Sequence, residues 1–250
     1  MPVLCPRLLR FVLTALCTGS GIGTLASAHA GSGELVMVAP LDQVMPIVRF
    51  QQGKLTGGML RDVGDALAQR LGRRPLYVNA EPAKVTEVLA GGRADLMCYV
   101  MPGWIDGDYA WSVPVLPDIE MVAARPGAPH LRSLKDLRDK PVGTVAGYRY
   151  PRVQQVLGQR FRRVDAESME ANLRRAVEGK TDYIIISEAT LAYLQRNASG
   201  VQLRPELVFA AFKTQCALSH KSRVPHAEIN QALEAMVKDG AIDQILARYR

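Results

Sequence analysis

Residues 83–100 read AKVTEVLAGGRADLMCYV, and the change of pattern within them indicates the fold class. Its first half, AKVTEVLA, has apolar residues at helical spacing and ends at Gly91-Gly92, whereas its second half, from Ala94 to Val100, is a short apolar run typical of a buried strand. The alternation extends toward the N-terminus through the strand PLYVN (75–79), the helix Met59–Leu71 and the strand ELVMVA (34–39). The order β-α-β-α-β predicts an open, mainly parallel sheet with helices on its faces, an α/β fold.

The same pattern repeats downstream of a middle stretch, Met121–Arg132. A strand PVGTVA (141–146) precedes a helix that carries Val153, Val156 and Leu157 on one face. The strand Phe161–Val164, the helix marked by Met169, Leu173 and Val177, and the strand Tyr183–Ile186 follow in order. Two α/β halves of similar size are therefore expected.

The carboxy end does not begin a third unit. Val208–Phe212 and Cys216–Ser219 resemble strands, and Pro225–Arg250 has the apolar spacing of a helix. A strand pair with one helix cannot bury its own apolar face, so we expect this segment to pack on the first half.

The second half is then an insertion, joined by crossing segments near residues 122–126 and 209–214. We expect one lobe from residues 31–123 and 213–250 and a second lobe from residues 124–212. Two lobes with two linkers form a cleft, which is a favoured site for a ligand.

The composition supports a folded protein and excludes several classes. The chain has 250 residues, of which 48% are hydrophobic and 22% charged, so disordered, collagenous and coiled-coil proteins are excluded. The formal net charge of +7 falls to +5 without Arg7 and Arg10, and the basic residues are not clustered, so nucleic-acid binding is not expected. The sequence has no GxSxG, HExxH or P-loop motif, and no cofactor or metal is expected.

Residues 1–30 have the pattern of a secretory signal peptide. Arg7 and Arg10 form a basic start, Phe11–Cys17 is apolar, and Ala28-His29-Ala30 supplies the small residues of a cleavage site. The apolar run is far shorter than the roughly 20 residues of a membrane-spanning helix. We expect cleavage after Ala30 and a periplasmic mature protein.

Two cysteines, Cys98 and Cys216, remain after cleavage. An oxidising compartment permits a disulfide between them. Both lie within apolar, strand-like segments, however, and two separate buried thiols are the simpler expectation from the sequence. Neither cysteine has a CxxC partner or a neighbouring histidine, so a metal site has no support.

Six segments in order along the mature chain resemble the extracellular solute-binding proteins of bacterial uptake systems, in the family (family 3) whose best-known members bind amino acids. They are GKLTGGMLRDVGDALAQRLG (53–72), EVLAGGRADL (87–96), YAWSVPVL (109–116), SLKDLRDKPVGTVAGY (133–148), LRRAVEGKTDYIIIS (173–187) and INQALEAMVKDGAIDQILARYR (229–250). The resemblance implies a two-lobed type II periplasmic-binding fold that closes on its ligand by hinge motion. It also implies a membrane permease of the ABC type, or a receptor, as partner.

The sequence departs from the family at the ligand clamp. Amino-acid binders of this family place an Arg shortly before an aromatic-Ser pair, here Trp111-Ser112, and that position falls on Trp104 or Ile105. No Lys or Arg occurs between Arg93 and Arg125. The position of the family's ammonium-pairing Asp falls on Ser187, which is also a natural helix N-cap.

The mature protein is therefore expected to bind a solute other than an ordinary α-amino acid. A second-lobe helix starting at Gly147-Tyr148, with Arg149 and Arg152 nearby, would suit one anionic group of the ligand. The candidate ligand-binding residues are Asp42, Tyr99, Trp104, Ser112, Thr144, Tyr148, Arg149, Ser187 and Glu188. Aromatic residues of this set suit a flat or partly apolar solute.

Three functions remain open. The favoured one is a monomeric binding protein that delivers a small solute to an importer. An exported enzyme on the same fold, similar to a cyclohexadienyl dehydratase, is an alternative; Asp42 and Glu188 are its candidate acids, but neither has a paired catalytic group. The third is a ligand-sensing partner of a membrane receptor.

Overall fold

The first lobe is built on a parallel sheet. The computed structural model describes residues 33–198 and 200–250, and the expected leader lies outside the described residues. The strands β1 (Glu34–Pro40), β4 (Arg74–Ala80) and β5 (Leu96–Val100) lie in the order β4-β1-β5 and are parallel. They are connected by α1 (Met59–Arg70), the 3-10 turn η1 (Pro82–Lys84) and α2 (Val85–Ala90).

The second lobe repeats this arrangement. Its parallel strands β10, β8 and β9 lie next to one another in that order. The elements of this lobe are η2 (Leu134–Leu137), β8 (Pro141–Val145), α3 (Pro151–Leu157), η3 (Gly158–Arg160), β9 (Arg162–Ala166), α4 (Met169–Val177), β10 (Tyr183–Ser187) and α5 (Glu188–Asn197).

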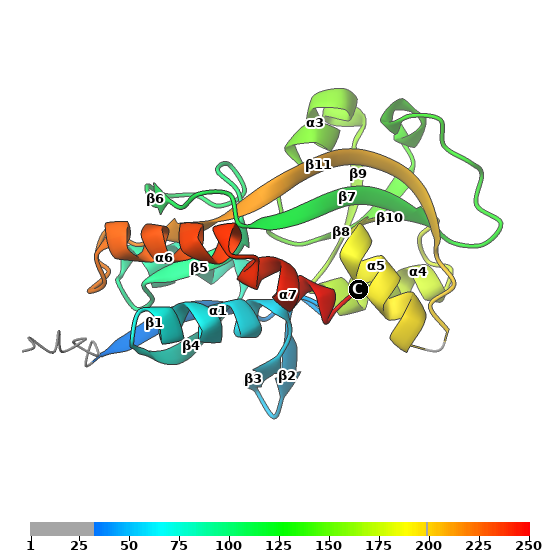
Figure 1. Cartoon of the computed structure of the whole chain (residues 1–250). Coiled ribbons are helices and arrows are strands. Elements are labelled where there is room, and N and C mark those ends of the chain that lie inside the picture. The colour runs from blue at the N-terminus through cyan, green and yellow to red at the C-terminus, as the bar shows by residue number, and fades with distance from the viewer. Residues whose placement is uncertain (1–32, 199) are drawn as a thin grey trace, which may run out of the picture.

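Two long antiparallel strands join the lobes. They are β7 (Leu116–Ala124) and β11 (Arg204–Leu218), which lie side by side and arch from one lobe to the other (Figure 1). At one end β11 pairs with β5 of the first lobe, and β7 pairs with β10 of the second. Both sheets are thereby continuous through the connecting strands.

Three smaller elements complete the first lobe. The hairpin β2 (Arg49–Gln51) and β3 (Lys54–Gly57) projects from it, and the short strand β6 (Ala110–Trp111) pairs with the end of β11. The C-terminal helices α6 (His226–Lys238) and α7 (Ala241–Ala247) pack beside α1 (Figure 1). The prediction that the carboxy end returns to the first half is confirmed.

Some predicted elements differ from those observed. The two strands expected within residues 208–219 are one continuous strand, β11, and the first residues of the expected middle stretch, from Met121, belong to β7. The helix expected over Pro225–Arg250 is broken at Gly240, which has φ +80°, a conformation that glycine adopts without strain.

Each lobe has its own apolar core. In the first lobe, Leu60, Val63 and Leu67 of α1 are buried against β1 and against α6 and α7. In the second, Ile184 and Ile186 of β10 are buried beneath α4 and α5. Apolar residues three and four positions apart produce the buried face of α1, and residues two positions apart produce that of β10. Within the described residues, no helix has the length and apolarity needed to span a bilayer.

A disulfide joins Cys98 of β5 to Cys216 of β11. The two residues are direct partners across this antiparallel strand pair. The expectation of two separate thiols is therefore wrong. Each segment alone resembles an ordinary buried strand, and only the strand pairing brings the two sulfur atoms together.

Candidate ligand-binding site

A cavity of about 320 Å³ lies between the lobes. The first lobe lines it from the end of β1 through the loop after β5, and the second from the loop after β8 to the start of α5. The connecting strand β7 supplies its inner wall. The polar and aromatic residues at its surface are Asp42, Gln43, Thr86, Tyr99, Trp104, Asp106, Asp118, Glu120, Tyr148, Arg149, Tyr150, Ser187 and Thr190.

Tyr99 has an unusual backbone conformation at the first-lobe wall. Its φ of +63° is in the left-handed region, although it belongs to strand β5. The register with β11 shifts at this point, because Cys98 pairs with Cys216 and Val100 pairs with Gln215, so Tyr99 is an extra residue in the ladder. Such a bulge redirects a side chain, here toward the cavity. The Tyr99 side chain is buried, and its hydroxyl has no hydrogen-bond partner among the described residues.

Trp104 lies in the loop after β5 and lines the same wall. Its ring packs edge-to-face on Phe212 of β11, with 5.3 Å between the ring centroids. Such a contact fixes the orientation of an aromatic ring. The first lobe thus presents two aromatic side chains, Tyr99 and Trp104, to the cavity.

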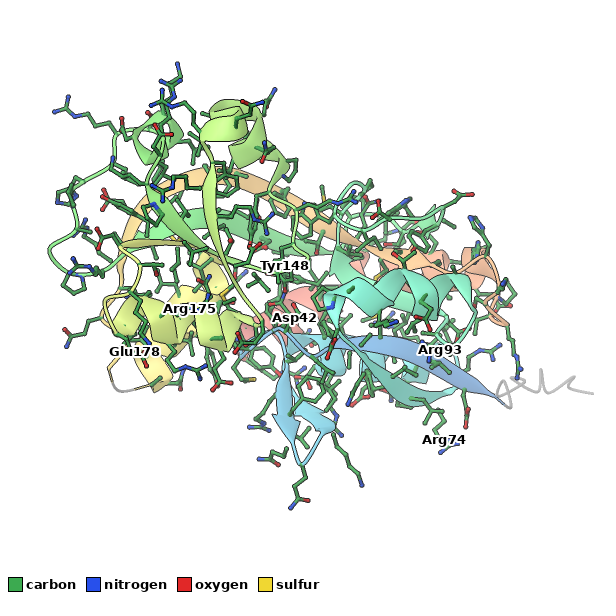
Figure 2. The ribbon with its side chains drawn as sticks, turned by 180° about the vertical axis from the view of Figure 1, so that it is seen from behind. Asp42, Arg74, Arg93, Tyr148, Arg175 and Glu178 are labelled. Carbon is green, nitrogen blue, oxygen red and sulfur yellow. A yellow bond between two sulfur atoms is a disulfide. The ribbon has the colours of Figure 1, made fainter. Side chains whose placement is uncertain are left out.

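Polar contacts connect the lobes at the rim. The Tyr148 hydroxyl donates to the Asp42 carboxylate and accepts from the side-chain amide of Gln43. Asp42 and Tyr148 lie where the two lobes meet (Figure 2). The backbone N–H of Met169 donates to the Asp42 carbonyl at 2.8 Å. Arg149 pairs with Asp106 at 2.5 Å, again from one lobe to the other.

These contacts change the pKa values of the rim groups. Burial raises the pKa of Asp42, and the Tyr148 hydrogen bond opposes that shift. Burial and the adjacent Asp42 carboxylate both raise the pKa of Tyr148 well above its usual value. Tyr148 is therefore a neutral hydrogen-bond donor to Asp42. The pair connects the two lobes by a hydrogen bond and not by an ion pair.

Two carboxylates on the inner wall were not among the predicted residues. Asp118 and Glu120 lie two positions apart on β7, so both side chains project from the same face of the strand, toward the cavity. Burial raises the pKa of Asp118 to about 6 and that of Glu120 to about 7. In the sequence they alternate with Ile119 and Met121, a pattern that also fits a solvated strand face, so only the position of β7 shows that they line the cavity.

Six of the nine predicted residues line the cavity: Asp42, Tyr99, Trp104, Tyr148, Arg149 and Ser187. The other three lie outside its lining. The Ser112 hydroxyl accepts from the Cys216 N–H at 2.8 Å, and the Thr144 hydroxyl donates to Asp165 at 2.6 Å; both residues are buried in the lobes. Glu188 is exposed in the first turn of α5.

The structure assigns Ser187 a capping role. Its hydroxyl oxygen accepts from the backbone N–H of Thr190 at 3.2 Å, as the N-cap of α5. The expected helix start at Gly147-Tyr148 is wrong, because α3 begins at Pro151. Arg152 donates to Gln155 at 3.1 Å within this short helix and is not among the cavity-lining residues.

The family's carboxylate clamp has no basic replacement in the cavity. Trp104 and Ile105, at the expected clamp position, both line it. Arg149 is the only Lys or Arg among the described lining residues, and it is paired with Asp106. In residues 33–198 and 200–250, no group of three or more His, Cys, Asp or Glu side chains is arranged to hold a metal ion.

Comparison with known proteins gives structural matches only. No protein-family model matches the chain, and no curated protein matches it. An amino-acid ABC transporter substrate-binding protein from Streptococcus pneumoniae, bound to L-arginine, superposes with a TM-score of 0.70 at 17% identity, covering 87% of this chain and 94% of that one.

Two further solved structures match the chain over most of its length. An ancestral amino-acid-binding protein, described as a precursor of cyclohexadienyl dehydratase, matches with a TM-score of 0.71 at 18% identity over 87% of this chain and 95% of its own. A histidine kinase sensor domain similar to periplasmic binding proteins matches with a TM-score of 0.72 at 19% identity over 86% and 95%. The chain thus has the two-lobed type II periplasmic-binding-protein fold, and its structural relatives include proteins that bind amino acids.

Proposed function

We propose that this protein is a periplasmic solute-binding protein that captures a small solute between its lobes. The main support for this proposal is the cavity, which is lined by both lobes and by the strand β7 that joins them. A ligand at this position contacts both lobes at once, so its binding energy favours their approach. The contacts of Tyr148 with Asp42 and of Arg149 with Asp106 join the two lobes, and we expect them in the closed form of the protein.

The partners and location follow from the same role. We expect the leader to direct export and to be cleaved after Ala30, which leaves a monomer in the periplasm. The lobes are expected to comprise residues 31–123 with 213–250, and residues 124–212. The closed form is expected to dock on a membrane permease of the ABC type, or on a receptor.

The solute is expected not to be an ordinary α-amino acid. A buried ligand carboxylate without a basic partner costs several kcal/mol. Arg149, the one Lys or Arg that lines the cavity in the described part of the chain, already has a partner in Asp106. Ser187, at the position of the family's ammonium-pairing Asp, carries no charge and caps α5.

A thermal-shift screen of residues 31–250 tests the binding function. The screen covers amino acids, organic acids, aromatic carboxylates, polyamines and sugars. A ligand of the folded state at about a hundredfold excess over its Kd adds about 2.7 kcal/mol of stability. We expect one chemical class to raise the melting temperature and the compound to be recovered unchanged by mass spectrometry. The absence of a shift from every class would contradict a solute-binding function.

An exported enzyme on this fold is the second candidate. Asp118 and Glu120 favour it, because acids with pKa values of about 6 and about 7 in a cavity suit proton transfer near neutral pH. Incubation of each screening hit with the protein separates the two functions. An enzyme converts the compound with turnover, whereas a binding protein returns it intact.

A further inference from the structure

The inner wall of the cavity contains two acids without a counter-ion. Among the ion pairs of the described residues, none includes Asp118 or Glu120. Asp118 is only 6% exposed, and it accepts a hydrogen bond at 2.9 Å from the backbone N–H of Ile119. Glu120 is half-buried beside it on the same face of β7. An unpaired carboxylate in such a position is costly to keep ionised.

The groups around the two acids add no positive charge. Tyr99 faces them from β5, and the Asp118 carboxylate adds to the effect of burial in raising the pKa of Tyr99. Glu188, at the start of α5, is a further negative charge near Asp118, and the Tyr150 hydroxyl is near Glu120. Arg163, whose guanidinium lies 5.2 Å from the centre of the Tyr150 ring, is paired with Asp165 at 2.7 Å.

A second observation points to a ligand at this position. The hydroxyl of Tyr99 is buried and lines the cavity beside the Asp118 carboxylate and Ser187, and within the described residues it forms no hydrogen bond of good geometry. A buried polar group without a partner is rare in folded proteins and requires an explanation. A ligand that carries N–H donors would satisfy this hydroxyl and the two carboxylates together.

The other lining residues suit an organic cation. Trp104 and Tyr148 present aromatic surface, which attracts ammonium and guanidinium groups. The lining contains four acids, Asp42, Asp106, Asp118 and Glu120, against a single base, Arg149. A zwitterion would bring its carboxylate into this negative field without a basic partner.

We propose that the solute is an organic ammonium or guanidinium cation without a free carboxylate, held with its charge against Asp118 and Glu120. The proposal rests on the solute-binding function above and names its ligand class. The acids of β7 then supply the charge recognition in this protein, and the aromatic side chains of both lobes, Trp104 and Tyr148, supply the contact surface.

Matched pairs of compounds test the proposal. Calorimetric titration of residues 31–250 compares L-arginine with its decarboxylated form, agmatine, and L-lysine with cadaverine; choline represents a cation without N–H groups. We expect at least one of the three cations without a carboxylate to bind, and a decarboxylated hit to bind roughly tenfold more tightly, or more, than its parent amino acid. Asp118→Asn and Glu120→Gln should each weaken that binding by roughly tenfold. Glu234→Gln, at an exposed site on α6, removes the same charge and should leave the affinity unchanged.

Proton release gives a readout that a structural role would not produce. Because both acids must be ionised to pair with the cation, affinity should rise between pH 5.5 and 8. Titrations at pH 6.5 in two buffers of different ionisation enthalpy should show protons released on binding. The release should shrink in Glu120→Gln, whose folding is verified by circular dichroism.

Different results would reject the cationic ligand and the solute-binding function. Equal or tighter binding of L-arginine than of agmatine would reject a ligand without a carboxylate. A hit from the sugars or organic acids, with none from the cations, would reject the cation and preserve the solute-binding function. No binding by any compound of either panel would count against both proposals.

Discussion

At the scale of single residues, the cavity contains groups whose conformation or burial lowers the stability of the folded protein. Tyr99 adopts a left-handed backbone conformation that is unfavourable for a residue with a Cβ, and its buried hydroxyl has no well-formed hydrogen bond within the described residues. Asp118 is a buried carboxylate and Glu120 a half-buried one, and the pKa values of both are raised. Strain and unsatisfied groups of this kind concentrate at functional sites, so we interpret all three as binding residues.

Tyr99→Phe tests the unpartnered hydroxyl. The substitution removes one oxygen and keeps the ring and its packing. We expect the free energy of unfolding to change by less than ~1 kcal/mol, because no hydrogen bond within the described residues is lost, while affinity for the solute falls roughly three- to tenfold. Urea unfolding and calorimetric titration measure the two quantities. A large loss of stability with unchanged affinity would indicate a structural role for the hydroxyl.

Glu120→Gln tests the cost of the buried charge through pH. The pKa of Glu120 is raised by burial and by the Asp118 charge, so the folded state binds this proton more tightly than the unfolded chain. The contribution of Glu120 to stability is present below about pH 4.5 and is lost as pH rises through about 7. Without ligand, the variant should therefore be about 1–3 kcal/mol more stable than the wild type at pH 8 and similar to it at pH 4.5.

Denaturant titration at both pH values measures this difference. Glu234→Gln, the exposed control on α6, should show no such gain at pH 8. A Glu120→Gln variant that is less stable than the wild type at pH 8 would show that the carboxylate has a favourable partner in the folded protein.

At the scale of elements, β7 and β11 carry the main functional features. They join the lobes, β7 supplies both inner-wall acids, and β11 holds Phe212 against Trp104 and Cys216 against Cys98. Local periodicity predicts the regular helices and strands of both lobes well, because each buries one apolar face. The same periodicity does not reveal that the two carboxylates of β7 face an enclosed cavity rather than solvent.

The disulfide should stabilise the connection between β5 and β11. Its cysteines are 118 positions apart, so the bond constrains a long loop of the unfolded chain. We expect Cys98→Ser combined with Cys216→Ser to lower the free energy of unfolding by about 2–4 kcal/mol. A reductant should lower the melting temperature of the wild type and leave that of the double variant unchanged. A wild-type melting temperature unaffected by complete reduction would contradict this expectation.

At the scale of the whole molecule, the order of strands and helices was predictable and the ligand was not. The repeated β-α-β pattern predicts two lobes. The carboxy-terminal segment cannot bury its apolar face alone, so it is expected to pack on the first lobe. Six predicted site residues line the cavity, because loops at the ends of parallel strands meet at one edge. Bulges such as that at Tyr99, and pairings such as Cys98 with Cys216, depend on register between distant strands, which the sequence pattern leaves open.

The proposed function requires that a solute be captured between two lobes that close on it. Small-angle X-ray scattering of residues 31–250, with and without a saturating hit from the screen, measures this closure. We expect a monomeric mass in both states and a smaller radius of gyration with ligand. An unchanged radius, with the ligand shown to be bound in the same sample, would contradict capture by closure.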